Sequence, residues 1–150
     1  MIRFASLGSG SRGNALLVEA GKTKVLLDCG FSARTATARL ARLDAVPDEL
    51  AAIVVTHEHA DHVAGVFAFA RNYQLTVYLT HGTYAAASRG RSTLPACRLI
   101  DGHTCFAIGD LEVRPFPVPH DAREPVQYAF SDGQHCLGVL TDTGSITPHI

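Results

Sequence analysis

The sequence lacks most features of a membrane protein, a secreted protein or a protein that coats nucleic acid. It contains no tryptophan, seven phenylalanines and four tyrosines, with no aromatic stripe of the kind on which single-strand binders stack bases. No apolar run approaches the roughly 20 residues of a membrane-spanning helix, and the opening MIRFASLGSG has no apolar signal-peptide segment. Thirteen basic and fourteen acidic residues give a formal net charge of −1, so the overall charge indicates no nucleic-acid partner.

Cysteine is also scarce, and its placement is informative. Cys29, Cys97, Cys105 and Cys136 are scattered along the chain without a C-x-x-C pair. This pattern argues against a zinc ribbon or a disulfide framework and is typical of a reduced, cytoplasmic protein. Cys29 follows Asp28 at the end of an expected strand, and we interpret it as a small buried hydrophobic residue.

The hydrophobic pattern predicts one mixed α/β domain. The chain has 150 residues, the length of one ordinary domain, and 47% of them are apolar, which is a globular composition. Hydrophobic periodicity predicts strands at 2–7, 15–19, 24–27, 52–55, 75–79, 111–118, 126–131 and 135–141, and helices at 32–43, 63–73 and 81–88. In the first helix, Leu40 and Leu43 are expected on the inner face. Hairpins early and late in the chain favour an α/β sandwich over an all-parallel doubly wound sheet.

A glycine-rich segment near the start, GSGSRG, matches the dinucleotide-binding pattern G-x-G-x-x-G. That motif requires a following helix, because the helix N-terminus holds the pyrophosphate. Here the next residues, ALLVEA, have strand character and lead into a tight turn. We therefore interpret the segment as a turn between two strands. Its backbone amides, with Asn14, would contact a phosphate only if the loop borders a site.

The clearest functional signal is THEHADH, which directly follows the apolar run AAIVV. A metalloprotease H-E-x-x-H helix would need histidine at the position of Asp61. On a helix, His57 and His59 would point about 200° apart, whereas in an extended segment they lie on the same side and can bind one metal ion. Asp61 and His62 would then face a second ion, where the chain turns into a helix near Val63. Imidazole and carboxylate together suit zinc, with manganese and iron as alternatives.

With Gly65, this stretch completes H-x-H-x-D-H-x-x-G, and the sequence resembles the metallo-β-lactamase fold superfamily along nearly its whole length. VLLDCG supplies an aspartate at a strand end, FPVPHDA an isolated histidine, and LGVLTDTG a further aspartate. By position, the resemblance implies a first metal site of His57, His59 and His120, a second of Asp61, His62 and the bridging Asp142, and Asp28 as a supporting residue that orients the loop.

The finer resemblance is to the YycJ/WalJ-type branch of bacterial cytosolic nucleases. It depends on SLGSGSRGN, VLLDCGFS, VVTHEHADHVAGV and PHDAREPVQYAF leading into GVLTDTG. The resemblance implies a dinuclear metal-dependent hydrolase acting on phosphodiester bonds, specifically a 5′–3′ DNA exonuclease. Two divalent ions, Zn²⁺ first and Mn²⁺ or Fe²⁺ next, would share a hydroxide nucleophile, and Asp61 would orient it. DNA is thus the expected partner, although the arginines around SRGRSTLPACR are equally typical of a solvated loop.

Other functions remain open at this point. A small-molecule hydrolase acting on a thioester, lactone or cyclic phosphodiester shares all the ligands. A tRNA 3′-processing endoribonuclease shares the motif but fits the Ser/Gly loop and PHDAREP less well. A flavodiiron oxidoreductase would have glutamate in place of His59, and a domain that only binds would have lost ligands. No general acid is identified, because His81, His103, His135 and His149 are interpreted as surface histidines.

The end of the chain carries its own prediction. The metallo-β-lactamase αββα sandwich has two similar halves, and the second half usually adds a histidine to the second metal. After Asp142 the sequence offers only His149, in SITPHI, which reads as the start of a helix. We therefore expect residues 1–150 to be a single domain, incomplete at its C-terminus, with an apolar sheet face exposed to water. Its second metal site should be weak and its activity low.

Overall fold

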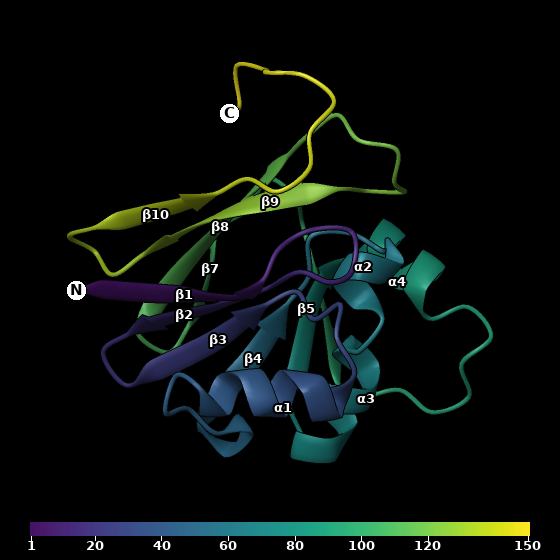
Figure 1. Cartoon of the computed structure of the whole chain (residues 1–150). Helices are drawn as coiled ribbons and strands as arrows, with labels where there is room; N and C mark the ends of the chain where they lie inside the picture. Colours follow the sequence, from purple (N-terminus) through teal and green to yellow (C-terminus); the bar gives the residue numbers. More distant parts are fainter.

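The computed structural model describes all of residues 1–150 and contains two β-sheets that pack face to face (Figure 1). The first sheet has the order β1-β2-β3-β4-β5-β6 and consists of β1 (Ile2–Gly8), β2 (Ala15–Ala20), β3 (Thr23–Leu27), β4 (Leu50–Val54), β5 (Thr76–Thr80) and β6 (Cys97–Ile100). Its first three strands are antiparallel, whereas β3 to β6 run parallel. The second sheet is antiparallel with the order β10-β9-β8-β7, from β7 (Phe106–Ile108), β8 (Leu111–Pro117), β9 (Val126–Ser131) and β10 (Cys136–Val139).

The helices contact the first sheet and leave the second one uncovered. They are α1 (Ala33–Ala41), the 3₁₀ helix η1 (Pro47–Glu49), α2 (Ala60–Val63), α3 (Val66–Tyr73) and α4 (His81–Ala87). Figure 1 shows no helix over the outer face of the second sheet. The predicted α/β sandwich is confirmed, with three of the four layers of an αββα arrangement present. None of the helices combines the length and apolar character that crossing a membrane requires.

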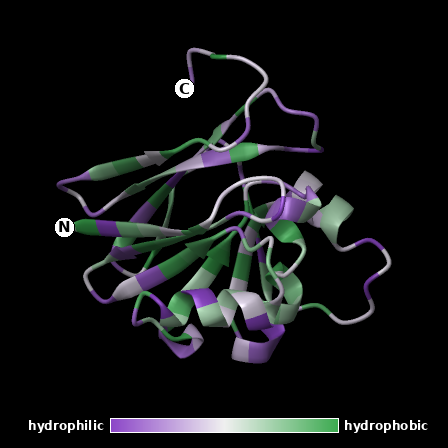
Figure 2. Ribbon diagram, viewed as in Figure 1, coloured by the Kyte–Doolittle hydropathy of each residue, from purple (hydrophilic) through white to green (hydrophobic).

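The central strands of the first sheet are buried on both faces, and each face has its own hydrophobic core. Along β3, Leu26 points into the core beneath the helices, whereas Val25 and Leu27 point into the core between the sheets, as the two-residue period of a strand requires. The second core is completed from the other sheet by Tyr128 and Phe130. Figure 2 shows the resulting hydrophobic interior along the central strands. Burial on both faces explains why VLL and AAIVV are continuously apolar.

Two local predictions were wrong at element ends. Leu43 was expected on the inner face of the first helix, but α1 ends at Ala41 and Leu43 is 39% exposed. The helical period therefore stops before it reaches Leu43. The expected helix start in SITPHI is absent, since the chain after β10 contains neither helix nor strand. Gly144 instead donates its N–H to the carbonyl of Pro119.

The helix expected to begin near Val63 begins earlier, at Ala60, with His59 at its N-cap position, and it is divided at Gly65 into α2 and α3. Gly65 donates its N–H to the Cys29 carbonyl at 2.9 Å. A Cβ atom at this position would lie only 1.6 Å from the carbonyl oxygen of Phe31. The last glycine of H-x-H-x-D-H-x-x-G thus allows the metal-motif helices to contact the loop after β3.

Gly65→Ala is therefore expected to lower the free energy of unfolding by about 3 kcal/mol, the upper range for forced overpacking. Chemical denaturation followed by circular dichroism would measure this loss. Gly138→Ala is the matched control, because no heavy atom lies within 4 Å of a Cβ placed there. Equal denaturation midpoints for the two variants would contradict the close-contact explanation.

Candidate metal centre

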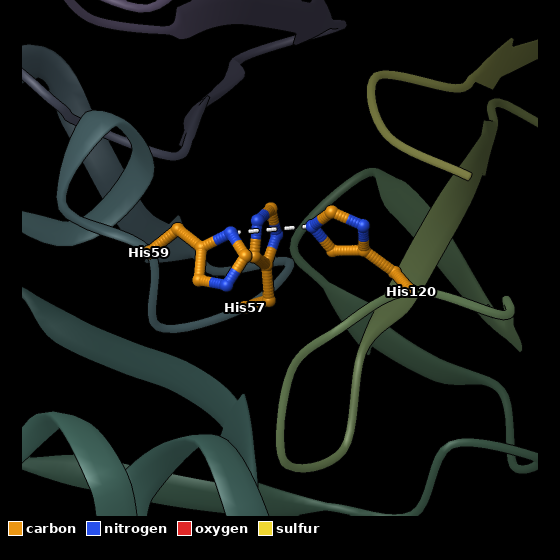
Figure 3. Close-up of side chains that lie close together, drawn as sticks. All are labelled: His57, His59 and His120. Atoms are coloured by element: carbon orange, nitrogen blue, oxygen red, sulfur yellow. Dashed lines mark hydrogen bonds between the residues drawn. The ribbon is translucent and has the colours of Figure 1, made fainter. Parts of the chain in front are cut away.

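The ligand-type side chains gather at one end of the sandwich, where the chain leaves β4, β8 and β10. His57 and His59 lie in the extended segment after β4, His120 in the loop after β8, and Asp142 after β10. Residues far apart in sequence therefore meet because both sheets present their strand ends on the same side. Figure 3 shows His57, His59 and His120 directed toward one another.

His57, His59 and His120 form the first group, in which one ligand atom from each residue lies within 4.8 Å of the others. The ring centroids of His57 and His59 are 4.6 Å apart, as two side chains on the same side of an extended segment would be. Nε2 of His120 lies 3.2 Å from Nδ1 of His59 (Figure 3). Three imidazoles converging with their nitrogens inward are a donor set typical of zinc sites.

Neighbouring hydrogen bonds decide which ring nitrogens face the group. Thr56 Oγ1 donates to Asp28 Oδ2 at 2.8 Å, so His57 Nδ1, 2.9 Å from that hydroxyl, is the donor to it. His57 Nε2 then has a lone pair and is buried without a hydrogen-bond partner. His59 Nε2 donates to the Asp121 carbonyl at 2.8 Å, so its Nδ1, which lies 3.2 Å from His120 Nε2, carries the lone pair. An unpaired buried nitrogen is costly, and a metal ion would satisfy it, so these residues fit a bound metal.

The environment of His57 keeps its ring uncharged, the form that binds a metal ion. Burial, followed by the nearby charge of His62, lowers the pKa of His57 to about 4. At neutral pH the ring is therefore uncharged, and metal binding would displace no proton from it.

His57 also belongs to a second group, with His62 and Asp142. Asp142 Oδ2 lies 2.8 Å from His62 Nε2 and 3.8 Å from His57 Nε2, so this carboxylate sits between the two histidines. Asp61 does not belong to the second group but lies next to it, since its Oδ2 is 3.6 Å from His62 Nε2. The sequence placed Asp61 among the second set of ligands, and the structure brings it next to that set.

Asp28 belongs to neither group but supports both of them. It is buried, its backbone is left-handed (φ 58°), and its Oδ2 accepts a hydrogen bond from His62 Nδ1 at 2.7 Å. Its Oδ1 accepts from the Thr56 N–H at 2.8 Å. Burial alone would lower the pKa of His62, but the hydrogen bond and charge of Asp28, together with the charges of Asp61 and Asp142, raise it. Asp28 thereby fixes the ring so that Nε2 faces Asp142.

Sequence reasoning did not foresee the role of Asn14. This buried side chain donates from Nδ2 to Asp61 Oδ2 at 3.1 Å and to the Gly10 carbonyl at 2.8 Å. Its backbone N–H also donates to the Asp61 carbonyl at 2.7 Å. The glycine-rich turn, which lies between β1 and β2 as predicted, is thus fixed against the metal motif. A hollow of about 360 Å³ separates Ser9–Ser11 from Asp61 and Asp142.

Cys29 is buried beside the metal centre, and its thiol is expected to be unreactive. Burial raises the pKa of its thiol to about 11, although a hydrogen bond with the Phe31 backbone acts in the opposite direction. Because only the thiolate is a nucleophile, Cys29 should resist alkylation at pH 8, where its thiol stays protonated. Mass spectrometry after iodoacetamide treatment should show modified Cys105 and Cys136, which are exposed, and modified Cys29 only in denaturant. Early labelling of Cys29 in the folded protein would overturn this.

The fold and this site define a class of protein. A sequence family described as a β-lactamase superfamily domain matches residues 23–150, and the chain belongs to this superfamily, in its metallo-β-lactamase fold. The solved Rm3 metallo-β-lactamase has the same fold, with a TM-score of 0.73 at 18% identity, over 89% of this chain and 56% of that one. The resemblance inferred from THEHADHVAG is confirmed.

Among curated proteins, the chain is similar to two bacterial nucleases. It is 36% identical to exodeoxyribonuclease YycJ of Bacillus anthracis, over 97% of this chain and 56% of the relative. It is 34% identical to exodeoxyribonuclease WalJ of Streptococcus pneumoniae strain D39, over 97% of this chain and 55% of the relative. The chain therefore spans about half the length of the curated relatives it matches.

Proposed function

We propose that this chain carries the metal centre of a two-metal hydrolase that cleaves phosphodiester bonds of DNA from the 5′ end. The observation that carries the proposal is the pair of ligand groups that share His57, with Asp142 between His57 and His62. The choice of DNA is supported by the names of the two relatives, YycJ and WalJ, which are exodeoxyribonucleases. The cytoplasmic location remains a prediction.

The ligand roles follow the geometry. His57, His59 and His120 would hold a first ion, and His62 and Asp142, with Asp61 beside them, would hold a second. Imidazole and carboxylate suit Zn²⁺, with Mn²⁺ or Fe²⁺ as alternatives. Two bound divalent ions would lower the pKa of water and polarise a phosphoryl oxygen.

Asp61 is the proposed catalytic residue. The residue is half-buried, and its Oδ2 accepts a hydrogen bond from Asn14 Nδ2 at 3.1 Å, which holds the carboxylate at the edge of the hollow shared with Asp142. In that position Oδ2 would hold a proton of the attacking water and aim its oxygen at phosphorus. Residues 1–150 would act as one domain in this function, because the two sheets share a core.

Relative rates on several substrates test this function. With Zn²⁺ or Mn²⁺ added, the chain should degrade 5′-labelled single- or double-stranded DNA and hydrolyse bis-p-nitrophenyl phosphate, at the low rate that a weak second metal site predicts. RNA, a thioester and a lactone should react more slowly. Asp61→Ala should lower turnover on DNA by at least about 10³-fold, or about 4 kcal/mol of transition-state stabilisation, without unfolding the chain. Rapid thioester or lactone hydrolysis with intact DNA would favour a small-molecule hydrolase, and selective cleavage of precursor tRNA an endoribonuclease.

A further inference from the structure

The loop that carries His120, residues 118–125, has no helix or strand of its own. Within it, the backbone hydrogen bonds run from Val118 N–H to the Pro125 carbonyl and from Ala122 N–H to the His120 carbonyl. It comes from the second sheet, whereas His57 and His59 come from the first. The place of His120 relative to the other two histidines must therefore be set by contacts that cross between the sheets.

One such contact is made by Glu58, the residue between His57 and His59. Glu58 Oε1 accepts a hydrogen bond from the Arg123 backbone N–H at 2.8 Å. On the next residue, His59 Nε2 donates to the Asp121 carbonyl at 2.8 Å. The two contacts hold the loop at positions 121 and 123, directly after His120.

Glu124, which lies in the loop itself, makes contacts with the first sheet and the helix that follows β5. Its Oε1 accepts from the Gly82 N–H at 2.7 Å, and its carbonyl accepts from Thr80 Oγ1 at 2.9 Å. The loop is thus fixed to the first sheet at its far end, at the junction of β5 and α4. The part of the loop nearest to His120 is therefore held by two side chains, His59 and Glu58, and of these only Glu58 is not a proposed metal ligand.

The environment of Glu58 indicates that this residue contributes more to the position of the loop than to the stability of the fold. Glu58 is half-buried, and its second oxygen, Oε2, is buried without a hydrogen-bond partner. A carboxylate with one oxygen left unpaired is an inefficient way to stabilise a fold, because its desolvation is only partly compensated. The same single contact is well suited to set the distance between two segments of chain.

We propose that Glu58 is a positioning residue for the first metal ion, holding the loop so that His120 Nε2 meets His57 Nε2 and His59 Nδ1. This inference builds on the proposed function, since it takes the three histidines as ligands. It assigns a role to the residue between the two histidines of H-x-H, which belongs to neither ligand group.

Cobalt titration of the wild type, Glu58→Ala and Glu58→Gln tests the proposal, with visible absorption of bound Co²⁺ reporting the histidine site. Glu58→Ala should bind the first ion about 10- to 100-fold more weakly, the usual effect of losing a residue that orients a ligand, and its Co²⁺ spectrum should change. Glu58→Gln keeps an oxygen acceptor for the Arg123 N–H and should restore wild-type affinity and spectrum. Glu112→Ala, at the other end of β8 in an exposed ion pair with Arg114, is the matched control.

The outcomes separate this inference from the function on which it is based. If wild-type protein binds no Co²⁺, the metal centre itself is wrong. If the wild type binds Co²⁺ and Glu58→Ala does so with the same affinity and spectrum, only the role of Glu58 is overturned. If Glu58→Gln is as weak as Glu58→Ala, charge and not position is responsible, which also overturns it.

Discussion

His57→Ala is expected to remove the first metal ion and to weaken the second, because His57 belongs to both ligand groups. The wild type should retain about two equivalents of Zn²⁺ per chain after gel filtration, with the second held less tightly. Loss of one of three protein ligands should weaken the first ion by more than the 10- to 100-fold that follows from the loss of a merely orienting residue. Elemental analysis and calorimetric titration would measure both effects.

Other histidine variants make this test specific. His120→Ala should affect only the first ion, because His120 occurs only in the group with His59. His62→Ala should affect only the second, and His135→Ala, at an exposed site, neither. The wild type should also gain stability with excess Zn²⁺, about 4 kcal/mol at 1,000 times the dissociation constant, and His57→Ala should lose most of this gain. Unchanged metal content in His57→Ala would exclude a shared ligand.

Asp28→Asn is expected to disable the second metal site while leaving the shape of the protein almost unchanged. Asparagine is isosteric and tolerates the left-handed backbone found at Asp28 (φ 58°). Its carbonyl oxygen can still accept from the Thr56 N–H, but its amide would then face His62 Nδ1 as a second donor. His62 would have to move its proton to Nε2, the nitrogen that lies 2.8 Å from Asp142. The wrong tautomer cannot bind a metal through Nε2.

The affinity for the second ion should therefore fall by about 100-fold, the upper end of the usual effect of losing a residue that orients a ligand. The first ion should weaken less, because among its ligands only His57 is linked to Asp28, through Thr56 Oγ1. Removing one partner of the buried Asp28–His62 pair should also cost about 3 kcal/mol of stability. Asp44→Asn is the matched control, since Asp44 also has a left-handed backbone (φ 53°) but is exposed. Metal titration and chemical denaturation of both variants would measure these effects. Two ions bound with wild-type affinity in Asp28→Asn would show that Asp28 does not orient His62.

The second sheet has an outer face that is exposed but not strongly apolar. The outer face of the second sheet is uncovered (Figure 1). It carries the exposed Glu112–Arg114 ion pair on β8 and the exposed Gly138 on β10. This face is therefore less apolar than the sequence led us to expect. The apolar side chains of these strands, among them Val113 and Tyr128, point inward to the core between the sheets.

Several features could be predicted from the sequence because they depend on neighbours along the chain. The two-residue period of the strands, the hairpins around the glycine-rich turn, and the same-side placement of His57 and His59 are all local. The ligand-type residues could also be named, since histidine and aspartate at strand ends form a recognisable pattern. The failures at Leu43 and at SITPHI were local as well, because a helical pattern does not show where a helix ends.

The amino-acid sequence by itself thus determined the family, the two-sheet α/β fold and the residues available to bind metal. Only the tertiary structure decided how these residues are used. It placed His57 in both ligand groups. It also set Asp61 beside the second group, where Asn14 hydrogen-bonds to it, and brought Asp28 into a hydrogen bond with His62. These relations join positions from 34 residues apart, for Asp28 and His62, to 85 residues apart, for His57 and Asp142. Their geometry therefore comes from the packing of the two sheets and cannot be predicted from a local pattern.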